Sequence, residues 1–291
     1  MARIAIIGGG SIGEALLSGL LRAGRQVKDL VVAERLADRA RYLAESYAVR
    51  VTTVTDAVQS ATFVIVAVKP ADVESVIGEI AQAAAEAESD SAEQVFVTVA
   101  AGVTTGYFES RLPAGTPVVR AMPNAPSLVG AGVSALAKGR FATPEQLEEV
   151  SALFGSVGGV LTVPEAQLDA VTAVSGSGPA YFFLMVEALV DAGVGAGLSR
   201  AVATELAAQT MAGSAAMLLE RIEQERRVAG DAPSDFRADT AAAQLRAMVT
   251  SPGGTTAAAL RELERGGLRA AVDSAVWAAK TRAEQLRTTS E

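Results

Sequence analysis

The sequence predicts an α/β fold with a doubly wound, mainly parallel sheet in its N-terminal part, followed by an all-α domain. Short β-rich runs alternate with helical runs over the first half of the chain. Several of these β-rich runs are almost continuously apolar, which is typical of strands covered on both faces by helices. After about residue 164 the strand signals stop. We therefore expect right-handed βαβ crossovers and two domains, at residues 1–163 and 164–291.

The predicted elements of the first domain follow in chain order. The helix after the first strand ends at a glycine, which is a common helix terminator. An acidic, alanine-rich segment at 81–94 predicts the end of a helix and an exposed loop. Strands are expected at 3–7, 30–34, 63–68, 95–100 and 117–122, and helices at 11–24 and 35–47.

The second domain is expected to be helical and partly covered by another subunit. The helices predicted at 178–192 and 199–224 carry small and apolar residues around most of their circumference, so we expect burial on several sides. A domain with so little polar surface is expected to hide part of it in a homo-oligomer. The polar residues 225–240 include Gly and Pro and predict a mobile connection.

The composition excludes several kinds of chemistry. The chain has no cysteine and no histidine, which removes disulfides, thiolate catalysis and the usual general base, and we expect no metal site. Its net charge of −8 argues against a nucleic-acid partner. The N-terminus lacks a signal-peptide pattern, and every apolar stretch of about 18 residues is interrupted by Gly, Pro or charge. We expect no membrane span and a cytoplasmic protein.

Three glycines form a nucleotide-binding pattern directly after the first predicted strand. Gly8, Gly10 and Gly13 follow the spacing G-x-G-x-x-G, with Ser11 and Ile12 at the start of the next helix. The first glycine permits a tight turn, the second lets a pyrophosphate approach the backbone, and the third lets helix and strand pack closely. Such a pattern alone is weak evidence, but its strand–turn–helix context predicts a Rossmann-type dinucleotide site contacted by these five residues.

The end of the second predicted strand bears on the choice of dinucleotide. Glu34 lies about 20 residues beyond Gly13, where an acid accepts hydrogen bonds from ribose hydroxyls and favours NAD. Arg35 follows at once, and Arg39 and Arg41 come soon after. These cations can instead hold a 2′-phosphate, or they are solvated helix residues. NADPH and NADH therefore both remain open.

Further cofactor contacts are expected at the carboxyl ends of the other strands, where the crevice of such a sheet lies. Lys69 precedes a proline and is expected to face this crevice. The small residues after the strand at 95–100 would let a nicotinamide lie against backbone. Asn124 is expected to contact the nicotinamide or to cap the chain. The contacts expected here are Val68, Lys69, Pro70, Ala100, Ala101, Gly102 and Asn124.

A hexapeptide near the C-terminus predicts an anion site. Ser251-Pro252-Gly253-Gly254-Thr255-Thr256 joins two glycines and three hydroxyls to the start of a helical run. Such a turn directs N–H groups and hydroxyls at one place with the helix dipole behind them, so an anion fits without lysine or arginine. The alternative is an ordinary helix N-cap. Ser175–Tyr181 is similarly either a compact wall beside a small substrate or a plain helix start.

Taken in order, these motifs resemble those of pyrroline-5-carboxylate reductases. The likeness covers nearly the whole chain, and the last two motifs together are specific. The chain departs from the family pattern at Glu34, because most members prefer NADPH, and in the longer polar connection around 225–240. The motifs that carry the likeness are VKP at 68–70, AAG at 100–102, RAMPN at 120–124, SGSGPAY at 175–181 and SPGGTT at 251–256.

The resemblance implies hydride transfer from NAD(P)H to the C=N bond of 1-pyrroline-5-carboxylate, which gives L-proline in the last step of its biosynthesis. NADPH is the expected cofactor, with NADH as an alternative. The C-terminal domain is expected to form homodimers that can assemble further, as in a pentamer of dimers, with active sites at the dimer interface. The expected catalytic residues are Ser251 and Thr256, and the expected substrate-binding residues are these two with Gly253, Gly254, Thr255 and Ser177.

This reaction suits a chain without histidine. A ketone reductase must supply a proton to a developing alkoxide, whereas a cyclic imine can enter already protonated and its carbon needs only a hydride. Two alternatives remain. A β-hydroxyacid or prephenate dehydrogenase would share the dinucleotide half, but the first is expected to use a lysine that helix 178–192 lacks, and the second a histidine. A non-catalytic NAD(P)-binding sensor would need no pocket at residues 251–256.

Overall fold

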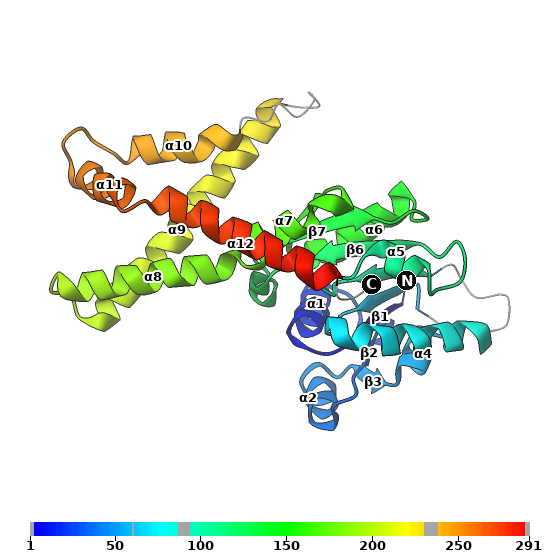
Figure 1. Ribbon diagram of the computed structural model, residues 1–291. Coiled ribbons are helices and arrows are strands. Elements are labelled where there is room, and N and C mark those ends of the chain that lie inside the picture. Colours follow the sequence, from blue (N-terminus) through cyan, green and yellow to red (C-terminus); the bar gives the residue numbers. More distant parts are fainter. Residues whose placement is uncertain (1–2, 60, 87–93, 230–237, 289–291) are drawn as a thin grey trace. The chain divides into compact units, whose positions relative to one another are not determined.

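A computed structural model describes residues 3–59, 61–86, 94–229 and 238–288 of the chain (Figure 1). The chain divides into two compact units. The first unit comprises Met1–Pro179 together with Val276–Glu291, and the second comprises Ala180–Ala275. The sequence boundary at residue 163 stays a prediction.

Within the described residues, the first unit contains an eight-stranded sheet in the order β3-β2-β1-β4-β5-β6-β7-β8. All neighbouring strands are parallel except β6 and β7, which are antiparallel. The strand order reverses between β1 and β4, so this is a doubly wound sheet of the Rossmann type. The strands are β1 Ile4–Ile7, β2 Leu30–Ala33, β3 Arg50–Thr52, β4 Phe63–Val66, β5 Val95–Thr98, β6 Val118–Met122, β7 Gly132–Lys138 and β8 Gly158–Thr162.

The register of three neighbouring strands, β2, β1 and β4, brings their ends level. Ile7 of β1 lies opposite Ala33 of β2 on one side and Val66 of β4 on the other. The residues that follow these strands therefore leave the sheet at one edge, among them Gly8 and Glu34. A doubly wound sheet binds its ligands at this edge, next to the point where the strand order reverses.

Helices cover both faces of the sheet, because the strands are apolar on both. Successive side chains of a strand point to opposite faces. Ile4 and Ile6 accordingly belong to one core, with Leu17 of α1 and Phe154 of α6. Each fully buried aliphatic or aromatic side chain of this kind contributes about 1.5–3 kcal/mol. The helices that pack on this face are α1 Ser11–Arg22, α2 Ala37–Tyr47 and α6 Pro144–Phe154.

The second core lies on the opposite face. Ala5 and Ile7, the alternate residues of β1, pack there with Ile77 of α4 and Phe108 of α5. The helices that supply this core are α3 Val54–Val58, α4 Val73–Glu86 and α5 Thr105–Glu109. Shorter turns are η1 Val27–Asp29, η2 Pro70–Asp72, η3 Ala125–Val129, η4 Gly155–Val157, η5 Glu165–Gln167, α7 Leu168–Val171 and the π-helical turn η6 Thr172–Gly176.

The five strands predicted from the sequence are confirmed, although each is one or two residues shorter than expected. Three further strands were missed. β3 has only three residues, too few to show a pattern, and β8 begins with two glycines and is largely exposed. β7 runs antiparallel to β6. The end of the helix predicted in 81–94 is confirmed as far as Glu86, and residues 87–93 lie outside the described part of the chain.

The second unit consists of helices, as expected. Val190 of α8 packs with Ala203 and Ala207 of α9 in a small core, and Arg221 of α9 donates a hydrogen bond of 2.8 Å to Gln244 of α10. The helices are α8 Gly178–Gly195, α9 Arg200–Ala229, α10 Ala238–Met248, α11 Thr255–Arg265 and α12 Leu268–Thr288, of which α8 and α12 extend into the first unit.

The polar connection predicted at 225–240 is wrong in its extent. Helix α9 continues to Ala229, and α10 begins at Ala238. An ion pair of 3.1 Å between Arg227 and Glu223, one helical turn apart, favours this extension. The sequence signal was misleading because such pairs make a polar segment look like a loop. Residues 230–237 lie outside the described part of the chain.

Apolar side chains are exposed on the helices of the second unit. Phe182, Phe183 and Leu184 of α8 are each about 60% exposed, at 62, 59 and 66%. The helical stretch Glu165–Gly195 has the length and hydropathy to cross a membrane. One stretch of this kind is weak evidence, because core and interface helices have the same composition. The absence of a membrane span stays a prediction.

We predict that Gly158→Ala destabilises the first unit. Gly158 has φ +147°, and a Cβ there would lie 2.6 Å from the backbone nitrogen of Gly132 on β7. The strained backbone and the displaced strand should cost about 1–3 kcal/mol of unfolding free energy. Denaturant unfolding measures the loss. Gly159→Ala is the matched control, because a Cβ at Gly159 meets open space. Equal stability of the two variants would contradict the prediction.

Candidate functional site

The turn after β1 has the geometry that its glycines predict. Gly8 has φ +102°, and a Cβ on it would lie 2.7 Å from the carbonyl oxygen of Ala67. A Cβ on Gly13 would collide with the carbonyl oxygen of Gly8. Both positions therefore require glycine, one for the turn after the strand and one for the close packing of α1.

The N-terminus of α1 is open. Gly10 is the N-cap residue and makes no side-chain hydrogen bond to the helix, and a Cβ on it would meet open space. Ser11 is exposed and Ile12 is half-buried. The unpaired N–H groups of the first helical turn can therefore receive a phosphate at this end of the helix dipole.

A cavity of about 660 Å³ lies along this edge of the first unit. It extends from the turn after β1 to the residues after β2 and β4, which is the place where the strand order reverses. The residues that line it are Gly8, Gly10, Ala33, Glu34, Arg35, Leu36, Ala40, Val51, Thr52, Thr53, Val54, Ala67, Val68, Lys69, Asp72, Ser75, Val76 and Glu79.

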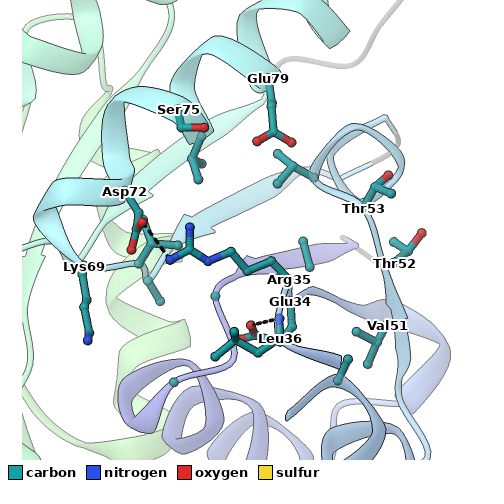
Figure 2. A pocket seen from close by; sticks show the side chains of 18 residues that line it. Glu34, Arg35, Leu36, Val51, Thr52, Thr53, Lys69, Asp72, Ser75 and Glu79 are labelled. Carbon is teal, nitrogen blue, oxygen red and sulfur yellow. Dashed lines mark hydrogen bonds and ion pairs between the residues drawn. The ribbon is translucent and has the colours of Figure 1, made fainter. Parts of the chain in front are cut away.

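Charged side chains of both signs line this cavity (Figure 2). Arg35 extends from the end of β2 and forms an ion pair of 2.9 Å with Asp72, which lies in η2 after β4. The Arg35 side chain is 75% exposed, so solvent screens this pair and Arg35 can exchange Asp72 for another anion. Lys69 is exposed beside it and makes no ion pair with any residue that the structure describes.

The carboxylate of Glu34 is held by backbone. It accepts a hydrogen bond of 2.9 Å from the N–H of Gly9 and one of 2.8 Å from the N–H of Leu36. Glu34 therefore faces the glycine-rich turn and remains next to the cavity. A ribose hydroxyl would have to share these oxygens, and a 2′-phosphate would meet their negative charge.

The other two arginines of this region make contacts within the protein. Arg41 is 68% exposed and lies 3.7 Å from Asp38 on its own helix, as expected for a solvated residue. Arg39 is different, because it donates a hydrogen bond of 2.6 Å to the carbonyl oxygen of Gly9 and forms an ion pair with Glu14.

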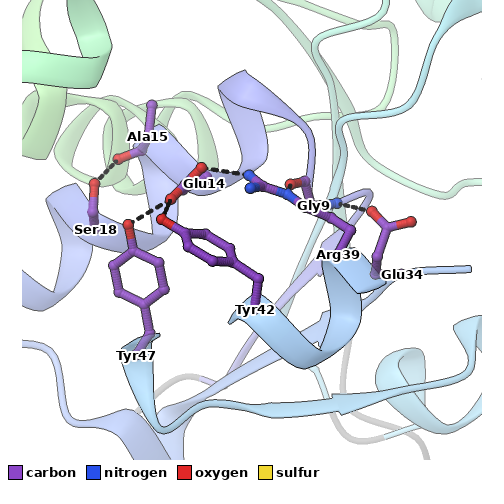
Figure 3. Close-up of polar contacts among 8 residues, drawn as sticks. All are labelled: Gly9, Glu14, Ala15, Ser18, Glu34, Arg39, Tyr42 and Tyr47. Atoms are coloured by element: carbon purple, nitrogen blue, oxygen red, sulfur yellow. Dashed lines mark hydrogen bonds and ion pairs between the residues drawn. The ribbon is translucent and has the colours of Figure 1, made fainter. Parts of the chain in front are cut away.

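Glu14 joins α1 to α2 (Figure 3). Besides Arg39, it receives hydrogen bonds from the hydroxyls of Tyr42, at 3.0 Å, and Tyr47, at 2.7 Å. Burial raises the pKa of Glu14, but the hydrogen bonds from Arg39, Tyr47 and Tyr42 outweigh burial and hold this pKa below its usual range. Burial, with the hydrogen bond to Glu14, raises the pKa of Tyr47 to about 12. Tyr47 therefore remains a donor throughout the neutral range.

The residues after β5 and β6 are not among those that line the cavity. Ala100 is buried, Ala101 is half-buried, and Gly102 makes a turn with φ +78°. Asn124 uses both ends of its side-chain amide within the protein, since it donates to the carbonyl of Ser175 at 3.2 Å and accepts from the N–H of Val133 at 2.9 Å. This geometry favours a structural role for Asn124.

Glu165 fixes the start of the C-terminal helical segment to the sheet. Its carboxylate accepts hydrogen bonds from the N–H of Thr105, at 2.8 Å, and from the hydroxyl of Thr105, at 2.7 Å. It also forms an ion pair of 3.3 Å with Arg120, whose side chain is only 4% exposed. A buried arginine needs such a partner, and a carboxylate at the first turn of α5 is favoured by the helix dipole.

Ser177 follows the π-helical turn η6. Its N–H donates to the carbonyl of Thr172 at 2.8 Å, and the residue is half-buried. A single π-helical turn is a local widening of a helix that often occurs at functional sites. A Cβ on Gly176, within that turn, would lie 2.9 Å from the end of the Met122 side chain, so the turn packs closely on β6.

The hexapeptide 251–256 forms a turn at the N-terminus of α11 in the second unit. Gly253 has φ +69°, and the N–H of Gly254 donates to the carbonyl of Ser251 at 3.0 Å. Gly254 is the N-cap residue and provides no side-chain cap. The hydroxyls of Ser251, Thr255 and Thr256 make no hydrogen bonds with the residues that the structure describes. The turn therefore offers a ligand these hydroxyls together with the N–H groups of the first turn of α11.

Sequence reasoning missed the wall of the cavity that β3, α3 and α4 provide. The β-branched run Val51–Val54 was a usable signal, but β3 is too short to be recognised alone. Asp72 gave no signal, because its pairing with Arg35 arises only when β2 and β4 lie on either side of β1. Clusters of three or more His, Cys, Asp or Glu side chains that could hold a metal ion are absent from the described residues.

The fold and its open glycine-rich turn define the class of protein, a dinucleotide-binding protein with a Rossmann domain and a helical domain. Residues 3–102 match the family model described as NADP oxidoreductase coenzyme F420-dependent. Residues 165–286 match the model described as pyrroline-5-carboxylate reductase dimerisation. A pyrroline-5-carboxylate reductase of Mycobacterium tuberculosis is 78% identical over 291 residues, which cover 100% of this chain and 99% of that protein. The chain belongs to the pyrroline-5-carboxylate reductase family, which confirms the resemblance.

Solved structures agree with this family. A pyrroline-5-carboxylate reductase of Coxiella burnetii is 34% identical with a TM-score of 0.85, over 98% of both chains. A pyrroline carboxylate reductase of Plasmodium falciparum, solved with NADP bound, is 26% identical with a TM-score of 0.77, over 98% of both chains. The predicted fold class, a Rossmann domain with an all-α dimerisation domain, is therefore confirmed.

We predict that Glu34→Gln raises the ratio of NADPH affinity to NADH affinity. The change removes a negative charge beside the cavity where a 2′-phosphate would lie, at similar side-chain volume. Titration of the variant and the wild type with each reduced dinucleotide measures the ratio. Glu45→Gln, an exposed site on α2, makes the same chemical change and should leave the ratio unaltered. If Glu34→Gln also leaves it unaltered, the carboxylate does not contribute to cofactor choice.

A second prediction concerns acid stability. The pKa of Glu14 is lowered in the folded chain, so its contribution to unfolding free energy is complete above the pKa of an unfolded carboxyl group and is lost as pH falls through the folded value. The stability difference between wild type and Glu14→Gln should therefore be largest near neutral pH and shrink below about pH 4. Urea unfolding at a series of pH values tests this. A difference that grows toward acid pH would contradict it.

Proposed function

We propose that this chain reduces 1-pyrroline-5-carboxylate to L-proline with NAD(P)H, as the last step of proline biosynthesis. The 78% identity to a pyrroline-5-carboxylate reductase over the whole chain carries this proposal. The proposed NAD(P)H site is the cavity at the carboxyl ends of β1, β2 and β4, with the pyrophosphate on the N-terminus of α1. The glycine-rich turn fits a pyrophosphate, because Gly8 has no room for a Cβ and forms the tight turn, whereas Gly10 is open to solvent.

NADPH is the proposed preferred cofactor, with NADH as an alternative. The match of residues 3–102 to an NADP oxidoreductase family supports this preference. Arg35 and Lys69 supply positive charge at the cavity, and Arg35 would exchange Asp72 for the 2′-phosphate. Val68 and Pro70 would border the cofactor beside Lys69. Ala100, Ala101 and Gly102 would border the nicotinamide, and Asn124 would hold the chain there through its contacts with Ser175 and Val133.

The proposed substrate site is the turn at 251–256. Its unpaired N–H groups and the hydroxyl of Ser251 would bind the substrate carboxylate, with Gly253, Gly254 and Thr255 shaping the cradle. The hydroxyl of Thr256 would orient the ring nitrogen, and Ser177 would border the substrate.

The chemistry requires little of these residues beyond alignment. NAD(P)H supplies the hydride, and the imine nitrogen can arrive protonated from water. The hydroxyl of Thr256 orients that nitrogen without changing its own protonation state. Alignment of two bound reactants in a site shielded from water is worth several powers of ten in rate. This division of labour is compatible with a chain that has no histidine and no cysteine.

We propose a homodimer through the helical domain, residues 164–291, with a pentamer of dimers as a further assembly. The match of 165–286 to a dimerisation family and the exposed apolar side chains of α8 support a second copy as the covering surface. The proposed location is the cytoplasm, and no nucleic-acid partner is proposed for a chain of net charge −8.

We predict that Thr256→Ala lowers kcat/KM for 1-pyrroline-5-carboxylate by about 10- to 100-fold while the Kd for NADPH stays near wild type, because one substrate hydrogen bond is lost. Loss of near-ultraviolet absorbance as NADPH is oxidised measures turnover. Thr116→Ala is the control, because this hydroxyl donates to Pro113 in a loop before β6, away from the cofactor edge. Weakened NADPH binding in Thr256→Ala would mean that the turn binds another ligand, and a wild type inactive on this imine would refute the function.

A further inference from the structure

We propose that Glu34 and Arg39 together clamp the peptide groups of Gly9, and that Arg39 is a positioning residue of the dinucleotide site rather than a ligand of the 2′-phosphate. This inference rests on the proposed binding of NAD(P)H and assigns a role to a residue outside the cavity. Arg39 is absent from the residues that line the cavity, although Ala40, its neighbour on α2, is among them.

Gly9 is the middle residue of the glycine-rich turn, and both of its backbone groups are held by side chains (Figure 3). Its N–H donates to Glu34 at 2.9 Å, and its carbonyl accepts from Nε of Arg39 at 2.6 Å. The two side chains carry opposite charges, and each matches the partial charge of the backbone group that it contacts. The orientation of the Gly9 backbone is thereby set from both sides.

Gly9 is also enclosed by packing. It is buried, and a Cβ on it would collide with Leu43 of α2 and lie 3.2 Å from the carboxylate of Glu34. A larger residue here would therefore displace the Leu43 side chain, and glycine lets the turn lie close to α2. A peptide enclosed in this way needs side chains to satisfy its hydrogen-bonding groups.

Arg39 is itself fixed in place. It forms an ion pair with Glu14, and its guanidinium lies 4.9 Å from the centre of the Tyr42 ring. The hydroxyls of Tyr42 and Tyr47 also donate to Glu14, so the acceptor of this ion pair is held by three donors. The side chains of Arg39 and Glu14 are only 28% and 17% exposed.

These contacts indicate different roles for Arg39 and Arg35 in the binding of a 2′-phosphate. A 2′-phosphate would have to draw Arg39 away from a partly buried carboxylate and from a backbone carbonyl. The Gly9 carbonyl would lose its side-chain donor, and Glu14 would keep only the two tyrosine hydroxyls. Arg35 gives up only a solvent-screened pair with Asp72. The geometry therefore assigns recognition of the 2′-phosphate to Arg35 and Lys69.

The clamp acts before the cofactor arrives. Three consecutive glycines, Gly8 to Gly10, have a large conformational freedom that binding must remove. A turn already held at Gly9 keeps the N-terminus of α1 in the orientation that receives the pyrophosphate, so less freedom is lost on binding. Because NADH and NADPH share this pyrophosphate, the clamp must favour both equally.

The test is direct titration of the wild type and of Arg39→Ala, Arg39→Lys, Arg35→Ala and Arg41→Ala with NADH and with NADPH, followed by the fluorescence of the bound dinucleotide. Arg39→Ala should weaken both dinucleotides by about the same factor, on the order of tenfold, because a charge-assisted hydrogen bond is lost. Arg39→Lys keeps a donor and a charge, so it should recover part of both affinities. Arg35→Ala should weaken NADPH alone, and the exposed Arg41→Ala should weaken neither.

Three outcomes would overturn the inference. A loss confined to NADPH in Arg39→Ala would make Arg39 a 2′-phosphate ligand, and unchanged affinities in both Arg39 variants would show that the clamp has no effect. If Arg39→Ala does not fold, the affinities of Arg39→Lys for NADH and NADPH decide between these results. An Arg39→Lys variant that recovers neither affinity counts against the clamp. A wild type that binds neither dinucleotide would instead refute the proposed function, which distinguishes the two failures.

Discussion

The level ends of β1, β2 and β4 are the constraint on which the rest of this site depends. Because Ile7 lies opposite both Ala33 and Val66, the turn after β1 leaves the sheet beside Glu34 on one side and the residues before Lys69 on the other. A shift of one residue in either pairing would exchange the two faces of a strand, and both apolar cores oppose that shift. The packing of the sheet therefore determines the geometry of the cavity.

The charged side chains near the cavity form two groups, which differ in how many contacts each side chain makes within the protein. Glu14, Glu34 and Arg39 are engaged with each other or with backbone around Gly9, and they define the shape of the turn. Arg35 and Lys69 are exposed, and among the described residues the one ion pair that they make, between Arg35 and Asp72, is open to solvent. A ligand competes easily for the second group and at higher cost for the first, because water screens partly buried contacts less than exposed ones.

The second unit has a different requirement. Its small core around Val190 buries few side chains, while Phe182 and Phe183 remain exposed. Helices with apolar residues on all sides are stable only where other surfaces cover them, and the match of 165–286 to a dimerisation family is consistent with cover from a second copy. The hydroxyls of the turn at 251–256 make no hydrogen bond within the described part of the chain, which leaves them available to a ligand.

The sequence alone determined the doubly wound sheet, the helical second half and the glycine-rich turn, because continuous apolar strands, helical periodicity and G-x-G-x-x-G are local patterns. Only the tertiary structure decided the length of α9, the presence of β3, β7 and β8, and the tasks of Glu34 and Arg39. Local sequence placed both charges near the second strand, but it could not show that each contacts Gly9. Those contacts form only when parallel pairing brings segments 25 and 30 residues apart together, and no local pattern records that distance.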